Sequence, residues 1–170
     1  RILSYKELPS TMDLAAQEAR QGTIEGTVVL ATEQTTGRGR FQRTWVSRPG
    51  NLLLSIVFYP SLKELPYLSM LPSVAVVRAI VGETGLAPKI KWPNDILIAG
   101  KKVAGVLVEN TLEGDAISYA IVGIGINIGM DTGQIPEIAP IATSLDLESG
   151  RNLDPAKILR RVLQELDKLY

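Results

Sequence analysis

The stretch from residue 34 to residue 45 combines arginine and glycine in a way that suits anion binding. Glycine lets the backbone pass close to a ligand, and the guanidinium fork of arginine matches the oxygens of carboxylates and phosphates. We call this stretch the arginine loop; a mobile surface hairpin with solvated arginines explains its composition equally well. Its chemistry-bearing residues are Gln34, Gly37, Arg38, Gly39, Arg40, Arg43 and Trp45.

The second candidate is Lys91, which precedes a Trp-Pro-Asn-Asp sequence at residues 92–95. Side chains alternate between the two faces of a strand, so Lys91 lies opposite Ile90 and Trp92. If Ile90 and Trp92 pack in the core, Lys91 faces a cleft or water. A solvated lysine is the more common outcome, but the neighbouring Asn94 and Asp95 favour a functional role.

Alternate glycines between residues 123 and 129 leave one face of an apolar strand without side chains. Close backbone packing in a sheet and a flat floor beneath a ligand explain this pattern equally well. Gly123 and Gly125 do not begin a dinucleotide-binding turn, because no G-x-G-x-x-G followed by a helix is present.

The elements that must position these residues are strands on both sides of the arginine loop and a helix before it. Ser10 and Asp13 resemble a capping box for a helix from about Thr11 to Gln21, and Ser10 either only caps this helix or also faces a ligand. Strands are expected at residues 2–5, 27–31, 52–59, 89–92, 96–98, 103–109 and 117–122, the last three forming an antiparallel meander. Further helices are expected at 67–83, at 143–150 and from Asp154 to the end.

The composition excludes several kinds of chemistry. The 170 residues contain neither cysteine nor histidine, which removes disulfides, thiolate or imidazole metal sites and Ser-His-Asp or Cys-His nucleophiles. Eighteen basic residues balance eighteen acidic ones, so no global field recruits nucleic acid. The mean hydropathy of +0.14 is that of a compact protein with one domain. We expect no apolar run that approaches the roughly 20 residues needed to span a membrane and no secretory signal peptide, and therefore a cytoplasmic location.

Taken together, five motifs resemble the catalytic domain of biotin protein ligases over essentially the whole length. The resemblance implies an α/β (α+β) fold of the class II synthetase-like biotin/lipoate ligase type, with a mixed, largely antiparallel central sheet flanked by helices. It implies an ATP-dependent, AMP-forming ligase that makes biotinyl-5'-AMP and passes the biotinyl group to a lysine of a carboxylase's biotin carboxyl carrier protein. The motifs are Gly37-Arg38-Gly39-Arg40, Arg43-x-Trp45, Lys91-Trp92-Pro93-Asn94-Asp95, Lys102-x-Ala104-Gly105 and Gly123-Ile124-Gly125-Ile126-Asn127.

The resemblance also implies roles for individual residues. As catalytic residues it implies Lys91, Arg38 and Arg40. As biotin-binding residues it implies Ser10, Thr11, Met12, Gln34, Gly37, Arg38, Gly39, Arg40, Lys91, Gly123 and Gly125. As ATP-binding residues it implies Arg40, Arg43, Trp45, Lys91, Asn94 and Asn127. Mg²⁺ is expected with ATP, and its protein ligands stay open.

Two positions depart from the family pattern. Met12 stands where asparagine is usual, and Gln42 stands where glycine is usual and should restrict bending of the arginine loop. We expect residues 1–170 to form a single catalytic domain, without the C-terminal β domain or N-terminal DNA-binding domain that family members carry; a homodimer is left open.

Two other functions compete with this interpretation. Lipoate or octanoate protein ligases and transferases share the scaffold, yet they use a histidine-containing motif that this chain cannot supply. A nucleic-acid-binding module would use the arginine loop, but the neutral charge and 5% aromatic content argue against it.

Overall fold

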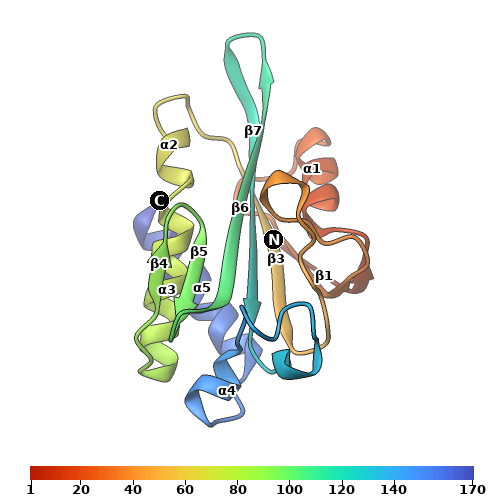
Figure 1. Ribbon diagram of the computed structural model, residues 1–170. Helices are drawn as coiled ribbons and strands as arrows, with labels where there is room; N and C mark the ends of the chain where they lie inside the picture. Colours follow the sequence, from red (N-terminus) through yellow and green to blue (C-terminus); the bar gives the residue numbers. More distant parts are fainter.

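The computed structural model describes residues 1–170, except for the side chain of Gln42. Its centre is a seven-stranded sheet with the order β1-β2-β3-β7-β6-β5-β4 (Figure 1). Only β1 and β2 pair in parallel among these strands, so the sheet is mixed and largely antiparallel, as predicted. The strands are β1 (Ile2–Leu8), β2 (Val28–Gln34), β3 (Asn51–Phe58), β4 (Lys89–Lys91), β5 (Asp95–Ile98), β6 (Lys101–Glu113) and β7 (Ala116–Asn127).

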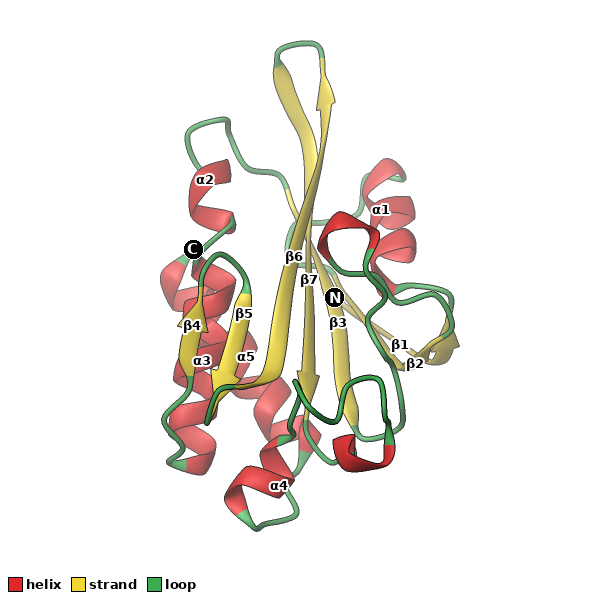
Figure 2. Ribbon diagram, viewed as in Figure 1, coloured by secondary structure: helices red, strands yellow, loops and turns green.

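Helices cover both faces of the sheet (Figure 2). On one face α3 and α5 pack together over β3, β6 and β7 and enclose the main apolar core. On the other face α1 covers parts of β2, β3 and β7 and encloses a smaller core. The helices are α1 (Thr11–Arg20), α2 (Leu65–Leu68), α3 (Leu71–Thr84), α4 (Leu145–Ser149) and α5 (Pro155–Leu169), with short 3-10 turns at Arg40–Gln42 and Thr132–Gln134.

The side chains of β3 point alternately to these two faces of the sheet. Leu52, Leu54 and Ile56 belong to the main core, whereas Val57 belongs to the core beneath α1. Because side chains alternate, Leu53 and Ser55 share the face of Val57. The part of this face that α1 leaves uncovered is available for a site.

The helix boundaries confirm the predicted N-caps at Ser10 and Asp154. Ser10 accepts a hydrogen bond from the Met12 N–H, and Asp154 accepts one from the Ala156 N–H, so both act as N-caps. The helix expected at 67–83 is divided, because α2 ends at Leu68 and α3 begins at Leu71 with Pro72 in its first turn.

The helical stretch Leu65–Thr84 has the length and apolar composition of a membrane-crossing segment, by those two criteria only. The expectation that no such stretch exists was therefore wrong. Ala75, Val76, Ala79 and Ile80 are fully buried in the main core, which accounts for much of the apolar composition of this stretch.

The lysine strand β4 does not meet the condition that Ile90 and Trp92 pack in the core. Ile90 is 41% exposed and Trp92 is 78% exposed, so neither lies in the core. The reason is that β4 is the last strand at its edge of the sheet. Its three residues are all exposed.

Glu165 joins α5 to α3 through a cluster of charges. Its carboxylate is largely buried, with Lys168 Nζ at 3.0 Å, Arg161 Nε at 3.3 Å and Arg78 Nη1 at 3.8 Å. The pKa of Glu165 lies below its ordinary value of 4.5, chiefly because Lys168 donates a hydrogen bond to it, with smaller contributions from the charges of Arg161 and Arg78.

This cluster predicts a pH-dependent contribution to stability. A carboxylate with a lowered folded-state pKa stabilises the fold above its unfolded pKa, and this stabilisation is lost as the pH falls through the folded value. We therefore expect Glu165→Gln to lower the melting temperature near neutral pH and to change it much less in acid well below 4.5. Thermal unfolding across pH tests this, with the exposed Glu113→Gln as control; an equal loss at every pH would contradict it.

Candidate functional site

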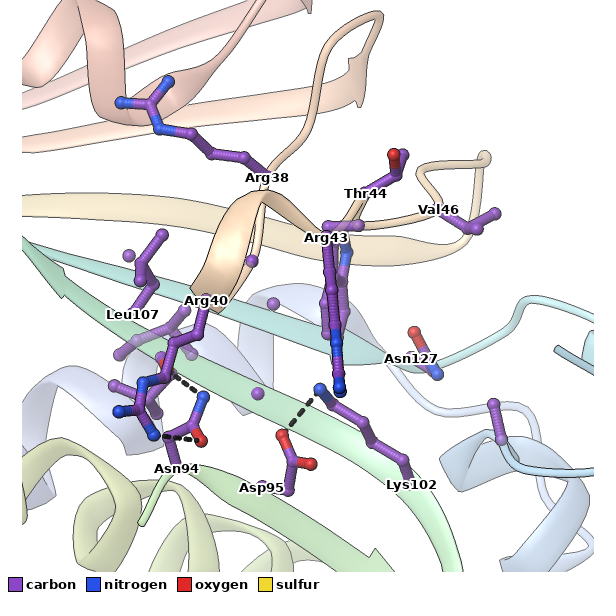
Figure 3. A pocket seen from close by; sticks show the side chains of 18 of the residues that line it. Arg38, Arg40, Arg43, Thr44, Val46, Asn94, Asp95, Lys102, Leu107 and Asn127 are labelled. Carbon is purple, nitrogen blue, oxygen red and sulfur yellow. Dashed lines mark hydrogen bonds and ion pairs between the residues drawn. The ribbon is translucent and has the colours of Figure 1, made fainter.

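One cavity of about 630 Å³ opens on the face of the sheet that α1 covers in part. Four segments far apart in the sequence form its walls: the start of α1, the arginine loop, the turn between β4 and β5, and the segment 138–142. Figure 3 shows charged side chains from the loop and from the β4–β6 region around this space. All the predicted site residues except Gly37 line the cavity.

Strand register places the lysine motif and the glycines in one row. Lys91 pairs with Asp95, Asp95 with Gly105, and Gly105 with Gly125. Gly125 in turn pairs with Leu53 of β3. Directly paired residues project to the same face of a sheet, so Lys91 and Asp95 stand beside a floor that lacks side chains.

Two of the protein's own side chains lie on this floor. A Cβ atom at Gly123 would stand 2.5 Å from the sulfur of Met12, and a Cβ at Gly125 would stand 2.5 Å from two ring carbons of Trp45. At Gly105 the same ring would be 3.0 Å away. The glycines therefore provide close approach to the sheet backbone, and any side chain at these positions would displace Met12 or Trp45.

Hydroxyl and amide groups gather at the α1 end of the cavity. Gln34 Oε1 accepts hydrogen bonds from the N–H of Thr11 at 2.7 Å and from its hydroxyl at 2.9 Å. The Thr11 hydroxyl also lies 2.8 Å from the hydroxyl of Ser55, which is fully buried. The predicted group Ser10, Thr11 and Gln34 is thus brought together in a fixed, polar arrangement.

Two serines in this region were missed by the sequence analysis. Ser47 accepts a hydrogen bond from the Gln34 N–H at 2.7 Å, and Ser55 supports Thr11 from β3. A single hydroxyl within the apolar run of residues 51–58 was a signal for Ser55, because a buried hydroxyl needs a partner.

Arg38 is held by carboxylates on two other elements. Its guanidinium donates to both carboxylate oxygens of Glu109, at 3.1 and 3.0 Å, and to Asp13 at 2.7 Å. Its pKa lies above the ordinary arginine value, chiefly because of the hydrogen bond with Glu109 and then that with Asp13, with burial opposing the shift. Arg38 therefore ties the arginine loop to α1 and β6. Asp13 accepts this hydrogen bond and also places a negative charge in the first turn of α1.

The side chain of Arg40 points in a different direction from that of Arg38. In Figure 3 Arg38 extends away from the side chains of Arg40 and Arg43, which reach toward the cavity floor. Arg40 Nη1 lies 3.5 Å from Asn94 Oδ1, and Asn94 Nδ2 donates to the carbonyl of Val106 at 2.9 Å. Asn94 thereby links the arginine loop to β6.

The arginine loop is closed by its own main-chain hydrogen bonds. The Gly39 N–H donates to the carbonyl of Arg43 at 2.7 Å, and the Trp45 N–H donates to the carbonyl of Gly37 at 2.9 Å. Gly37 is buried, and a Cβ there would stand 2.8 Å from the carbonyl oxygen of Trp45, so this glycine permits the loop to close. The expected effect of Gln42 concerns a side chain outside the described part of the structure.

Lys102 and Asp95 form an ion pair at the floor, with 2.6 Å between Nζ and Oδ1. Lys102 Nζ also lies 5.1 Å from the centre of the Trp45 ring. Both residues lie in motifs quoted above, but no role was predicted for either. The pairing depends on an irregular register between β5 and β6, which a sequence pattern does not reveal.

Residues 138–142 form the far wall of the cavity and meet β6, where the Lys102 N–H donates to the carbonyl of Ile141 at 2.8 Å. Next to it Asn127, as predicted, reaches the cavity and donates from Nδ2 to the carbonyl of Thr143 at 3.0 Å. The part of the chain that the structure describes contains no group of three or more His, Cys, Asp or Glu side chains suited to hold a metal ion.

Comparison with known proteins agrees with this geometry. Residues 5–127 match the model of the biotin/lipoate A/B protein ligase family. The chain is 41% identical to the bifunctional ligase/repressor BirA of Bacillus spizizenii, over 99% of this chain and 53% of the relative. It is 38% identical to the biotin--[acetyl-CoA-carboxylase] ligase of Paracoccus denitrificans, over 77% of this chain and 57% of that protein. The chain thus spans about half the length of these curated relatives.

Among solved structures, the biotin protein ligase of Aquifex aeolicus in complex with biotin and ATP superposes with a TM-score of 0.84 and 35% identity. The match covers 99% of this chain and 69% of that one. The family model spans most of the chain, and the structural match covers more than two thirds of the solved ligase. The chain therefore belongs to the biotin/lipoate A/B protein ligase family, and within it to the biotin protein ligases, whose catalytic-domain fold it has.

Proposed function

We propose that this chain is an ATP-dependent biotin–protein ligase domain that forms biotinyl-5'-AMP and transfers the biotinyl group to a lysine of a carboxylase carrier protein. The observation that carries the proposal is the row from Lys91 to Gly125, in which a cation stands beside a floor of glycines that carry no side chains of their own. The relative named biotin--[acetyl-CoA-carboxylase] ligase supports a carboxylase carrier as acceptor.

The first step joins two anions. A carboxylate oxygen of biotin attacks the α-phosphorus of ATP, the bond to the β-phosphate oxygen breaks, and pyrophosphate leaves. Fixed cations stabilise the negative charge that builds up, and no proton-shuttling group is required. We assign this role to Lys91 and Arg40, with Arg43 on the phosphate side, since all three line the cavity.

The second step needs no additional protein nucleophile. The amine of the acceptor lysine attacks the acyl carbon of the adenylate, the bond to the phosphate oxygen breaks, and AMP leaves while the amine loses a proton. The cavity is open to solvent on the side of Arg40 and Trp92, both of which are exposed, so an acceptor side chain can enter there.

The polar end of the cavity suits the ureido ring of biotin. Ser10, Thr11 and Gln34 supply donors and acceptors there, and Met12 supplies an apolar wall over Gly123. We assign Gly37, Arg38 and Gly39, which were also predicted to contact biotin, to the loop that surrounds it. Gly125 was predicted to contact biotin as well, but we assign it to the nucleotide side because the Trp45 ring lies over it. Because Arg38 is fully engaged by carboxylates, its proposed contribution is to hold the loop in place.

The nucleotide side is assigned to Trp45, Asn94 and Asn127. Mg²⁺ is proposed to arrive with the triphosphate. The cavity offers one carboxylate, Asp95, which Lys102 already neutralises, so the described residues suit an ion held mainly by phosphate oxygens and water.

Further properties of the protein are proposals that rest on the same assignment. We propose a cytoplasmic location, a single catalytic domain over residues 1–170 and the possibility of a homodimer. Activity on lipoate is disfavoured, because the relatives described above are named as biotin ligases. Nucleic-acid binding by this chain is disfavoured by its balanced charge.

The proposal is tested by biotin-dependent exchange of labelled pyrophosphate into ATP, with lipoate in place of biotin as control. We expect exchange with biotin and none with lipoate. Exchange only with lipoate would show that lipoate, and not biotin, is the substrate. Absence of exchange with folded protein would overturn the proposed adenylation step. Salt-sensitive binding to mixed oligonucleotides without exchange would favour the binding-module alternative.

A further inference from the structure

Lys102 and Asp95 have no role in the chemistry proposed above, yet they meet at the floor of the cavity. Their ion pair is short, 2.6 Å, and both side chains are only about one third exposed, at 33% and 28%. Asp95 stands in the same row as Lys91, and its partner is Lys102. The pair therefore has a defined place in the site.

The ammonium of Lys102 is also in contact with Trp45. Its Nζ lies 5.1 Å from the ring centre, within the range of a cation–π interaction. The stem of Lys102 crosses Gly105, where a Cβ would stand 3.0 Å from Lys102 Cε and 3.1 Å from Nζ. Glycine at this position is what lets the lysine lie beside the indole.

Trp45 rests on the floor without any polar anchor. Its ring lies over Gly125, where a Cβ would stand 2.5 Å from two ring carbons, and its Nε1 is buried without a hydrogen-bond partner among the described residues. The main-chain bond from Trp45 to Gly37 fixes the backbone but leaves the ring orientation to its neighbours. The glycine floor and Lys102 are the neighbours that determine it.

The main chain of Lys102 is fixed as well. Its N–H donates to the carbonyl of Ile141, and its carbonyl accepts from the Thr143 N–H at 2.9 Å. Backbone bonds on one side and Asp95 on the other leave the long side chain little freedom, so the ammonium can act as a fixed support.

We propose that Lys102, anchored by Asp95, is a positioning residue that holds the Trp45 indole flat on Gly105 and Gly125, and that the indole thereby forms a fixed wall for the planar base of an adenine nucleotide. This inference rests on the proposed function for the identity of the nucleotide. The seating of Trp45 itself does not depend on it.

The spectroscopic test follows Trp45 alone. The chain has two tryptophans, so Trp92→Phe leaves Trp45 as the only indole. In this background we expect Lys102→Met and Asp95→Asn each to increase acrylamide quenching of Trp45 fluorescence, and Lys102→Arg to leave it near the parent value. If quenching is unchanged in both Lys102→Met and Asp95→Asn, the proposal is wrong.

The kinetic test uses the pyrophosphate exchange assay on the otherwise unchanged chain. Loss of a cation–π contact predicts that Lys102→Met raises KM for ATP between about 2- and 30-fold and changes KM for biotin less than about 2-fold. Lys101→Met is the matched control, because Lys101 is the adjacent exposed lysine and does not line the cavity.

Asp95→Asn separates positioning from direct contact with phosphate. If Lys102 acts through Trp45, releasing it from Asp95 raises KM for ATP; if Lys102 binds phosphate itself, releasing it lowers or preserves KM and the proposal fails. An equal rise of both KM values also overturns it. If the parent chain shows no exchange at all, the proposed function fails while the quenching result still decides the seating of Trp45.

Discussion

Lys91→Ala is expected to lower the rate of biotin-dependent adenylate formation by roughly 10²-fold, because it removes about 3 kcal/mol of stabilisation from the negative charge that develops as biotin attacks the α-phosphorus. Lys91 is an exposed residue of an edge strand, without a buried side chain to lose. The free energy of unfolding should therefore change by less than about 1 kcal/mol. Single-turnover formation of biotinyl-5'-AMP and chemical denaturation measure the two effects.

Lys89 provides a matched control for this variant. It belongs to the same strand, has the same alternation as Lys91 and is exposed, but it does not line the cavity. Lys89→Ala should leave adenylate formation within about 2-fold of the parent, since surface substitutions rarely change more than about 0.5 kcal/mol. Similar losses in both variants would indicate a general effect of charge on the edge strand, and a large loss of stability in Lys91→Ala would indicate a structural role.

Gly125→Ala is the second substitution with a large expected effect. Its new methyl group would stand 2.5 Å from two ring carbons of Trp45, so the indole must leave the floor. Overpacking of this kind costs about 1–3 kcal/mol, and we expect kcat/KM for ATP to fall between about 5- and 150-fold. Steady-state exchange kinetics and the thermal shift produced by ATP would record this loss.

Gly123→Ala tests whether the effect is specific to the nucleotide side. There the new methyl group would meet the sulfur of Met12, whose side chain is flexible and can move aside. We expect Gly123→Ala to raise KM for biotin more than KM for ATP, the reverse of Gly125→Ala. Identical profiles for the two variants would contradict a floor divided between the two substrates.

The sequence predicted the position of the arginine loop well, because apolar runs flank it on both sides. The loop joins β2 to β3, and the predicted polar group at Gln34 lies at the end of β2, where it meets α1. The helix expected from Asp154 onward is also present as α5, which buries Ile158, Val162 and Leu166 at helical spacing.

Contacts between segments distant in sequence were beyond such patterns. Whether Ile90 and Trp92 pack in the core was left as a condition by the sequence, and the structure leaves both exposed because β4 lies at an edge of the sheet. The pairing of Asp95 with Lys102 depends on an irregular register, and the wall at 138–142 depends on an isolated parallel bridge between Lys102 and Ala142. Neither has a periodic signature.

The internal hydrogen bonds of the arginine loop affect the entropy of substrate binding. Ordering a free backbone costs about 1–2 kcal/mol per residue, which a long disordered loop would subtract from the affinity for its ligands. Here the bonds from Gly39 to Arg43 and from Trp45 to Gly37 already fold the loop as a small hairpin. Because these bonds already restrict the backbone of the loop, less conformational entropy is lost when a substrate binds, and more of the binding energy remains for catalysis.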